Sequence, residues 1–282
     1  MALSEAFADE GAVSVDITDA REGMPDETPV FGEPGGEVEL AFGLNRMVVL
    51  FAPGTDIDRA VAAAVAACGL AGTPAFKVSD IPERDWVRAT QGQFSPIRIS
   101  QRLWIVPSWH ELPDPTAINI VLDPGLAFGT GSHPTTRLCL GWLDRSMRPG
   151  RSVIDYGCGS GILAIAAAKL GAARVCGIDI DDQAVESSRY NARNNGVSIG
   201  FSNAAEPAPA PADIVLANIL SNPLKVLAPL LADLTRPGGT AVLSGILAAQ
   251  AGDVAAVYEE WFDIQLPAYD EGWTCLVGMR RS

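Results

Sequence analysis

The 282-residue chain lacks the patterns that mark secreted, membrane-spanning and metal-binding proteins. Its five cysteines lie far apart with no C-x-x-C pair, which argues against a zinc site or disulfide frame and favours reduced thiols. No run of eighteen apolar residues suggests a membrane span. The acidic segment 1–10 lacks the basic start and apolar stretch of a signal peptide. We therefore expect a cytoplasmic protein without a metal site or a membrane partner.

Histidine and basic charge are also scarce. There are two histidines, and 20 Lys+Arg stand against 34 Asp+Glu, for a formal net charge of −14. Residues 1–100 hold sixteen acids and seven bases, whereas residues 101–282 hold eighteen and thirteen. Such a chain should repel bare nucleic acid, because phosphate binding depends on clustered Lys and Arg. The acidic first third favours a basic protein partner, although ordinary solubility charge would produce the same excess.

The composition and the predicted secondary structure of the chain change at two places. Residues 1–100 mix short strand-like runs, an alanine-rich helical run and loops rich in Pro, Gly and acid, which predicts a small α+β domain. Its expected elements are strands at Ala12–Thr18, Met47–Phe51 and Phe76–Val78 and a helix at Ile57–Cys68. A strand-rich connector broken by prolines follows at 101–124. The remaining residues, 125–282, form the second predicted domain.

This second domain alternates helix and strand, which predicts a parallel doubly wound sheet. The expected strands are 152–155, 174–179, 197–201, 213–218, 240–244, 262–266 and 273–279. The last two have no helix between them and must pair as a hairpin, so the final strand is antiparallel. The predicted fold is therefore α/β and Rossmann-like, with a mostly parallel seven-stranded sheet. A closing hairpin of this kind is typical of methyltransferases and not of dinucleotide-binding domains.

The most informative run is VIDYGCGSG, in which an apolar strand ends and a glycine-dense turn leads into a helix. Gly157, Gly159 and Gly161 lack a Cβ, so the backbone can approach a ligand closely. A dinucleotide fingerprint, G-x-G-x-x-G, would need a glycine at position 162, where Ile162 stands. The pattern D-x-G-x-G-x-G instead resembles the first motif of the Rossmann-like methyltransferases, which implies S-adenosyl-L-methionine as the ligand, and Ile162 disfavours an NAD dehydrogenase. We expect Asp155 to shape this loop and to face the positive sulfonium region.

Acceptor side chains stand at two other strand ends. Asp179 closes the second strand, where a carboxylate can accept hydrogen bonds from both ribose hydroxyls of a nucleoside. Asn218 ends the fourth strand, at the carboxyl edge where open sheets bind ligands. Its side-chain oxygen suits a neutral amine, and burial lowers the pKa of a lysine. The alternative for Asn218 is a capping role in a turn.

The loop LDPGLAFGTGSHPTT, at 122–136, is rich in glycines and hydroxyls and lies just before a helix. Together with D-x-G-x-G-x-G and with A-N-I-L at 217–220, it resembles the PrmA family. These bacterial enzymes methylate a large-subunit ribosomal protein, the eleventh by name, on lysine and N-terminal amines. The runs DWVR at 85–88 and RLWIVPSW at 102–109 resemble the family's connector, so the resemblance spans essentially the whole chain.

The resemblance implies a protein N-methyltransferase that uses S-adenosyl-L-methionine, with a substrate-recognition domain at 1–100 and a basic ribosomal protein as its partner. The implied cofactor-contacting residues are Thr136, Gly157, Asp179, Asn218 and, in the loop before the helix, Phe128. His133 falls in the same loop. It is either a general base for the amine or, as the short distance to the helix start favours, a hydrogen-bonded helix cap.

Two alternatives stay open at this point. Many amino-group methyltransferases place Pro-Pro-aromatic after the Asn, but Ile219, Leu220 and Ser221 follow it here and offer the amine no aromatic face. The substrate could therefore be a different protein lysine or a small amine. The chain could also be a non-catalytic module that binds S-adenosyl-L-methionine.

Overall fold

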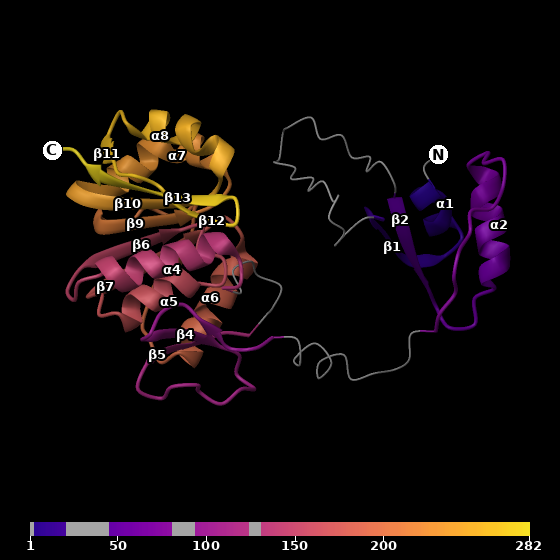
Figure 1. Ribbon diagram of the computed structural model, residues 1–282, viewed down its shortest axis with the longest axis horizontal. Coiled ribbons are helices and arrows are strands. Elements are labelled where there is room, and N and C mark those ends of the chain that lie inside the picture. The colour runs from indigo at the N-terminus through magenta and orange to yellow at the C-terminus, as the bar shows by residue number, and fades with distance from the viewer. Residues whose placement is uncertain (1–2, 21–44, 81–93, 124–130) are drawn as a thin grey trace. The chain divides into compact units, whose positions relative to one another are not determined.

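The computed structural model divides the chain into two compact units, Met1–Arg84 and Asp85–Ser282 (Figure 1). The residues that it describes are 3–20, 45–80, 94–123 and 131–282. Within these ranges no helix is both long and apolar enough to cross a lipid bilayer.

The smaller unit packs two helices against a two-stranded sheet. Its elements are α1 (Leu3–Asp9), β1 (Ala12–Asp19), β2 (Asn45–Phe51) and α2 (Ile57–Ala67), and the two strands are antiparallel. The predictions of β1, β2 and α2 are confirmed, and α1 is an element that they missed. A small core of alanines, valines and Phe7 lies between the helices and the sheet. Asp56 caps α2 by accepting a hydrogen bond from the Arg59 N–H.

The predicted strand at Phe76–Val78 is wrong. These residues have no regular secondary structure, and Phe76 and Val78 are 50% and 55% exposed. A strand needs a hydrogen-bonded partner, and this run pairs with no strand of the described residues. The alternation of apolar residues alone therefore did not suffice to form one.

The larger unit is built on the predicted sheet, except that the third strand, expected at 197–201, lies at Gly200–Asn203. Its strands are β6 (Ser152–Tyr156), β7 (Arg174–Asp179), β8 (Gly200–Asn203), β9 (Ala212–Asn218), β10 (Thr235–Leu247), β11 (Phe262–Ile264) and β13 (Trp273–Arg280). They lie in the order β11-β13-β10-β9-β6-β7-β8, and a short eighth strand, β12 (Ala268–Asp270), pairs with β13. Strand β13 is antiparallel to β10 and β11, whereas the pairs from β10 to β8 are parallel. The predicted closing hairpin and antiparallel last strand are confirmed.

Helices cover both faces of this sheet (Figure 1). They are α4 (Pro134–Ser146), α5 (Ile162–Lys169), α6 (Asp182–Asn194), α7 (Ser221–Leu234) and α8 (Ala251–Tyr258), the last preceded by a 3₁₀ turn at Ala248–Gln250. Two separate hydrophobic clusters result. One joins α4 and α5 to the sheet, and the other joins α7 and α8 to it. Burial on both faces is why the middle positions of β6 and β9, such as Val153, Ile154 and Ile214–Ala217, are apolar.

The segment that we expected to be a connector packs against the larger unit. Strands β3 (Ile97–Arg98), β4 (Leu103–Val106) and β5 (Ile118–Val121) form a three-stranded sheet, whose apolar residues join the α4–α5 cluster. Asn195 fastens the edge of this sheet. Its side chain accepts a hydrogen bond from the Val121 N–H at 2.8 Å and donates one to the Val121 carbonyl at 2.7 Å.

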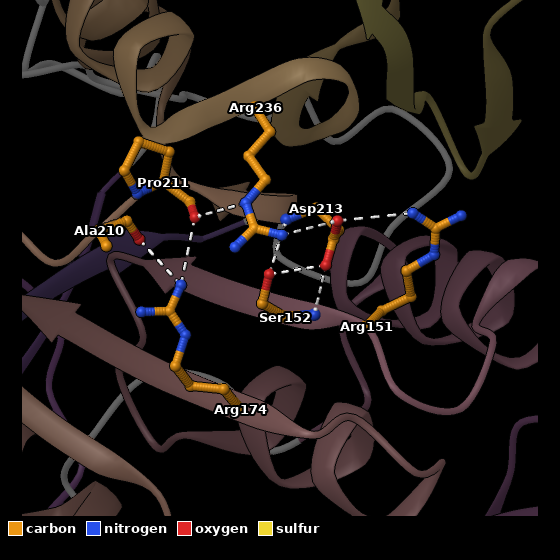
Figure 2. A network of polar contacts seen from close by, with 7 residues as sticks. All are labelled: Arg151, Ser152, Arg174, Ala210, Pro211, Asp213 and Arg236. Carbon is orange, nitrogen blue, oxygen red and sulfur yellow. Dashed lines mark hydrogen bonds and ion pairs between the residues drawn. The ribbon is translucent and has the colours of Figure 1, made fainter.

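The amino end of the large sheet is tied together by Asp213 (Figure 2). Its carboxylate accepts hydrogen bonds from the backbone N–H and the hydroxyl of Ser152, both at 2.7 Å. Arg236 and Arg151 lie on either side of it, with N–O distances of 3.2 Å and 3.5 Å. The Ser152 hydrogen bonds, followed by the two arginines, lower the pKa of Asp213 to about 2. This network joins β6, β9 and β10 at the end opposite the predicted ligand edge.

Candidate active site

The glycine turn lies at the carboxyl end of β6. Gly157, Gly159 and Gly161 all have positive φ, at 75°, 53° and 79°. A Cβ on Gly157 would collide with the side chain of Ile219, so this glycine is required by both conformation and space. The N–H of Gly157 donates to the carbonyl of Ile178 at 2.8 Å, which binds the turn to β7. The turn is therefore rigidly placed between two neighbouring strands.

Asp179 lies directly beside this turn. One of its carboxylate oxygens accepts a hydrogen bond from the Gly159 N–H at 2.8 Å, and the other accepts one from the Asp181 N–H at 3.1 Å. Each oxygen has further lone pairs, so the carboxylate keeps acceptor capacity for a ligand. Asp181 is the N-cap of α6 and accepts from the Gln183 N–H at 2.9 Å. The backbone thus aligns Asp179 with the glycine turn.

Asp155 is buried beneath the turn, with 1% of its surface exposed. One carboxylate oxygen accepts a hydrogen bond from the Ala164 N–H in the first turn of α5 at 3.0 Å. The other oxygen is buried and has no hydrogen-bond partner among the residues that the structure describes. Burial above all, with a smaller contribution from the charge of Asp179, raises the pKa of Asp155 to about 7. A nearby positive charge would favour the ionised form.

Asn218 occupies the carboxyl end of β9, next to β6 and β10 in the sheet. Its amide nitrogen lies 3.4 Å from the hydroxyl oxygen of Thr136, which is completely buried in the first turn of α4. Its carbonyl oxygen is buried and accepts no hydrogen bond from the described part of the chain. A buried acceptor without a partner costs free energy, so it marks a position where a donor is expected.

A β-bulge in β10 places the residue that follows Asn218. The register with β13 shifts between Leu243 and Ile246, and the intervening Gly245 has φ +84°. A Cβ at Gly245 would collide with the carbonyl of Ile219, whose N–H donates to the carbonyl of Ser244 at 3.1 Å. The sequence analysis missed Gly245. A glycine inside a strand pattern is the signal that could have found it.

His133 caps α4. Its Nδ1 lies 2.7 Å from the hydroxyl oxygen of Thr135 and accepts from the backbone N–H of the same residue at 3.4 Å. Burial and the positive charge of Arg137 lower the pKa of His133, whereas the negative charge of Glu271 raises it by less. The ring of Trp273 meets the imidazole edge-to-face, with centroids 4.8 Å apart. Sequence reasoning missed Trp273, because it lies more than 130 residues further along the chain.

Two further residues complete the comparison with the sequence. Phe128 lies outside the described residues, so the structure places Thr136, Asp155, the three glycines, Asp179, Asn218 and His133 only. Cys158, in the glycine turn, is buried, and burial raises the pKa of its thiol far above neutrality. Because the thiolate is the nucleophilic form, this environment favours a space-filling role for Cys158 in the loop over a nucleophilic one.

Comparison with known proteins identifies the family. The family model described as Ribosomal protein L11 methyltransferase (PrmA) matches residues 1–281. This chain belongs to the PrmA family. The resemblance found in the sequence motifs is therefore confirmed, and with it the prediction of a protein methyltransferase that uses S-adenosyl-L-methionine.

The relatives cover nearly the full length. The chain is 57% identical to a ribosomal protein L11 methyltransferase from Thiobacillus denitrificans and 54% identical to one from Dechloromonas aromatica, in each case over 99% of this chain and 94% of the relative. A crystal structure of ribosomal protein L11 methylase from Lactobacillus delbrueckii subsp. bulgaricus is 35% identical. It aligns with a TM-score of 0.63 and covers 67% of this chain and 100% of the solved one.

The residues at the carboxyl edge fit S-adenosyl-L-methionine. The positive-φ glycines keep side chains away from the turn, and Asp179 retains acceptor capacity beside it. Asp155 contributes a buried carboxylate that a cationic group would stabilise in its ionised form. These are the features that a positively charged nucleoside requires, and they come from adjacent strands of one sheet.

Proposed function

We propose that this enzyme methylates amino groups of ribosomal protein L11, on lysine side chains, the N-terminus or both. The observation that carries the proposal is the buried Asn218 carbonyl oxygen, which lacks a donor at the edge where the glycine turn lies. An amine is the donor that this position suits, because it can share one hydrogen with the oxygen and keep its lone pair for the methyl group. When bound, S-adenosyl-L-methionine supplies a methyl group that is already activated by the sulfonium charge.

In this proposal the residues of the carboxyl edge have separate roles in binding the methyl donor and the amine. Asp179 binds the ribose hydroxyls, and the glycine turn lets its backbone approach the methionine part closely. Asp155, ionised in the complex, balances the positive charge. Thr136 binds the Asn218 amide nitrogen and thereby directs the carbonyl oxygen to the amine. Because a lysine must lose its proton before it can react, a buried position that lowers its pKa favours the reaction.

We further propose that residues 1–100 recognise the substrate and that the protein acts in the cytoplasm. This segment carries sixteen acidic and seven basic residues, so it attracts a basic ribosomal protein and repels bare nucleic acid. The names of the relatives, which are ribosomal protein L11 methyltransferases over nearly the full length, support the same substrate.

Competition between substrates tests the assignment. The purified enzyme is given labelled methyl donor together with L11, a second ribosomal protein of similar net charge, and free lysine. We expect label on L11 at a kcat/KM well above that for the other two. Equal labelling of the second protein would indicate an enzyme that accepts protein amines without selecting L11. Labelling of free lysine alone would indicate a small-amine enzyme. Binding of the donor without any labelling would indicate a non-catalytic module.

A further inference from the structure

The turn between β12 and β13 reaches the start of α4. Arg137, in the first turn of α4, lies 2.8 Å from a carboxylate oxygen of Asp270 and 2.8 Å from one of Glu271. Its Nε donates a second hydrogen bond to Asp270 at 3.0 Å, and its Nη1 donates to the carbonyl of Ser132 at 2.5 Å. One guanidinium therefore joins the turn to the segment just before the helix.

Glu271 occupies an unusual place for its residue type. It is the one non-glycine residue with positive φ, at 46°, in the described part of the chain, and Gly272 follows at 80°. Asp270 pairs with Trp273, so Glu271 and Gly272 are the two central residues of a two-residue hairpin turn, and both have positive φ. Such turns prefer Asn, Asp or Gly at the first position, because a Cβ is strained there. The turn keeps a glutamate at that position, and this glutamate contacts Arg137.

The segment that the turn contacts belongs to the active site. His133, Thr135 and Thr136 lie between Ser132 and Arg137, and Thr136 holds the Asn218 amide. The ring of Trp273, on the other side of the turn, also meets His133. The hairpin thus contacts the start of α4 at two points, one ionic and one aromatic.

We propose that Arg137, Asp270 and Glu271 are positioning residues for methyl transfer. They fix the first turn of α4 against the β12–β13 hairpin, so that Thr136 presents its hydroxyl to Asn218 at the required place. None of the three forms a hydrogen bond or ion pair with Asn218 in the described structure, and they act through Thr136. This inference rests on the proposed role of Asn218 in holding the amine.

Replacing Glu271 by Asn separates positioning from hairpin stability. Asn is favoured at this turn position, so the hairpin is retained. The ion pair between Glu271 and Arg137 is lost, whereas the one between Asp270 and Arg137 stays. We expect the backbone amides of Thr136 and Arg137, which both donate to the His133 carbonyl, to exchange with solvent roughly three- to tenfold faster. We expect kcat to fall by a similar factor while the KM for L11 stays unchanged. The control is Arg281→Ala, which breaks the exposed ion pair with Asp263, and it should change neither quantity.

Arg137→Ala and the double variant complete the experiment. If the two side chains act as one unit, the double variant loses no more than Arg137→Ala alone. Unchanged exchange and kcat in Glu271→Asn, additive losses, or faster exchange with unchanged kcat would each overturn the proposal. The exchange arm needs no substrate. Absence of L11 methylation by the unaltered enzyme would therefore contradict the proposed function, while the exchange result still decides whether the turn holds Thr136.

Discussion

The side chains of Asn218 and Thr136 lie together, with the amide nitrogen 3.4 Å from the hydroxyl oxygen, although 82 residues separate them in the chain. One stands at the end of β9 and the other in the first buried turn of α4. One amide N–H is directed at Thr136, and the buried carbonyl oxygen, which has no partner in the described part of the chain, is available as an acceptor for a ligand. This relationship gives the carboxyl edge of the sheet a directed acceptor.

Removing that acceptor should slow methyl transfer. We expect Asn218→Ala to lower kcat/KM by about 10- to 100-fold, because a hydrogen bond to a group that becomes charged is worth about 1.5–3 kcal/mol. Steady-state kinetics with L11 provides the measurement. The control is Asn222→Ala, an exposed position near the start of α7. Equal turnover in the two variants would show that Asn218 only caps the turn.

Asp179 should contribute to cofactor binding. We expect Asp179→Ala to weaken S-adenosyl-L-methionine binding by about 1–3 kcal/mol, because the carboxylate accepts charge-assisted hydrogen bonds from the ribose. Titration calorimetry measures the affinity directly. The neighbouring Asp182→Ala, at the start of α6, serves as the control. An unchanged dissociation constant for Asp179→Ala would place the ribose elsewhere.

Gly157 should tolerate no side chain. Gly157→Ala places a Cβ against Ile219 and forces alanine into positive φ, whereas Gly196→Ala has the same kind of φ, at 66°, with open space around it. The difference between the two variants therefore isolates the collision. We expect Gly157→Ala to lower the free energy of unfolding by about 1–3 kcal/mol more than Gly196→Ala does, as judged by denaturant unfolding. Equal losses of unfolding free energy in the two variants would mean that the turn accommodates a Cβ at position 157 without a collision.

The raised pKa of Asp155 makes stability depend on pH. Its pKa is about 7 in the folded protein and near 3.8 in the unfolded chain, so the folded state holds the proton more tightly. The resulting stabilisation is complete below about pH 4 and is lost as pH rises through 7. We expect Asp155→Asn to unfold at higher denaturant concentration than the unaltered protein at pH 8, and this gain to shrink towards pH 5. Parallel unfolding curves at each pH measure it, and a gain that does not change with pH would contradict the assigned pKa.

The same group links cofactor binding to protons. A cationic ligand favours ionised Asp155, so we expect S-adenosyl-L-methionine to bind more tightly at pH 8 than at pH 6 and to release a proton at the lower pH. Calorimetry in buffers of different ionisation enthalpy detects that proton. Asp155→Asn should abolish the release, and its persistence in the variant would assign the proton to another group.

Local pattern was enough to predict where the candidate cofactor residues lie in the fold; their contacts with the cofactor stay a prediction. The glycine turn, Asp155 and Asp179 stand at the ends of adjacent parallel strands, and each strand carries its own apolar signal in the sequence. Alternation of helix and strand then determines that these ends meet at one edge. The closing hairpin was predictable for the same reason, since no helix separates its two strands.

Contacts between distant segments were not predictable from the sequence. Trp273 meets His133, and Arg137 meets Asp270, only because β13 returns antiparallel and brings its turn to the start of α4. No local periodicity encodes such a contact. The strand expected at Phe76–Val78 failed for a related reason, because pairing depends on a partner strand and not on the apolar pattern of the run itself.

Mass spectrometry of L11 tests the central claim most directly. Purified L11 is incubated with S-adenosyl-L-methionine and either the unaltered enzyme or the Asp179→Ala variant, and its peptides are then sequenced. The account predicts methyl increments on lysine side-chain or N-terminal amines with the unaltered enzyme and far fewer with the variant. L11 that gains no methyl group on any amine, from an enzyme that binds the methyl donor, would contradict it.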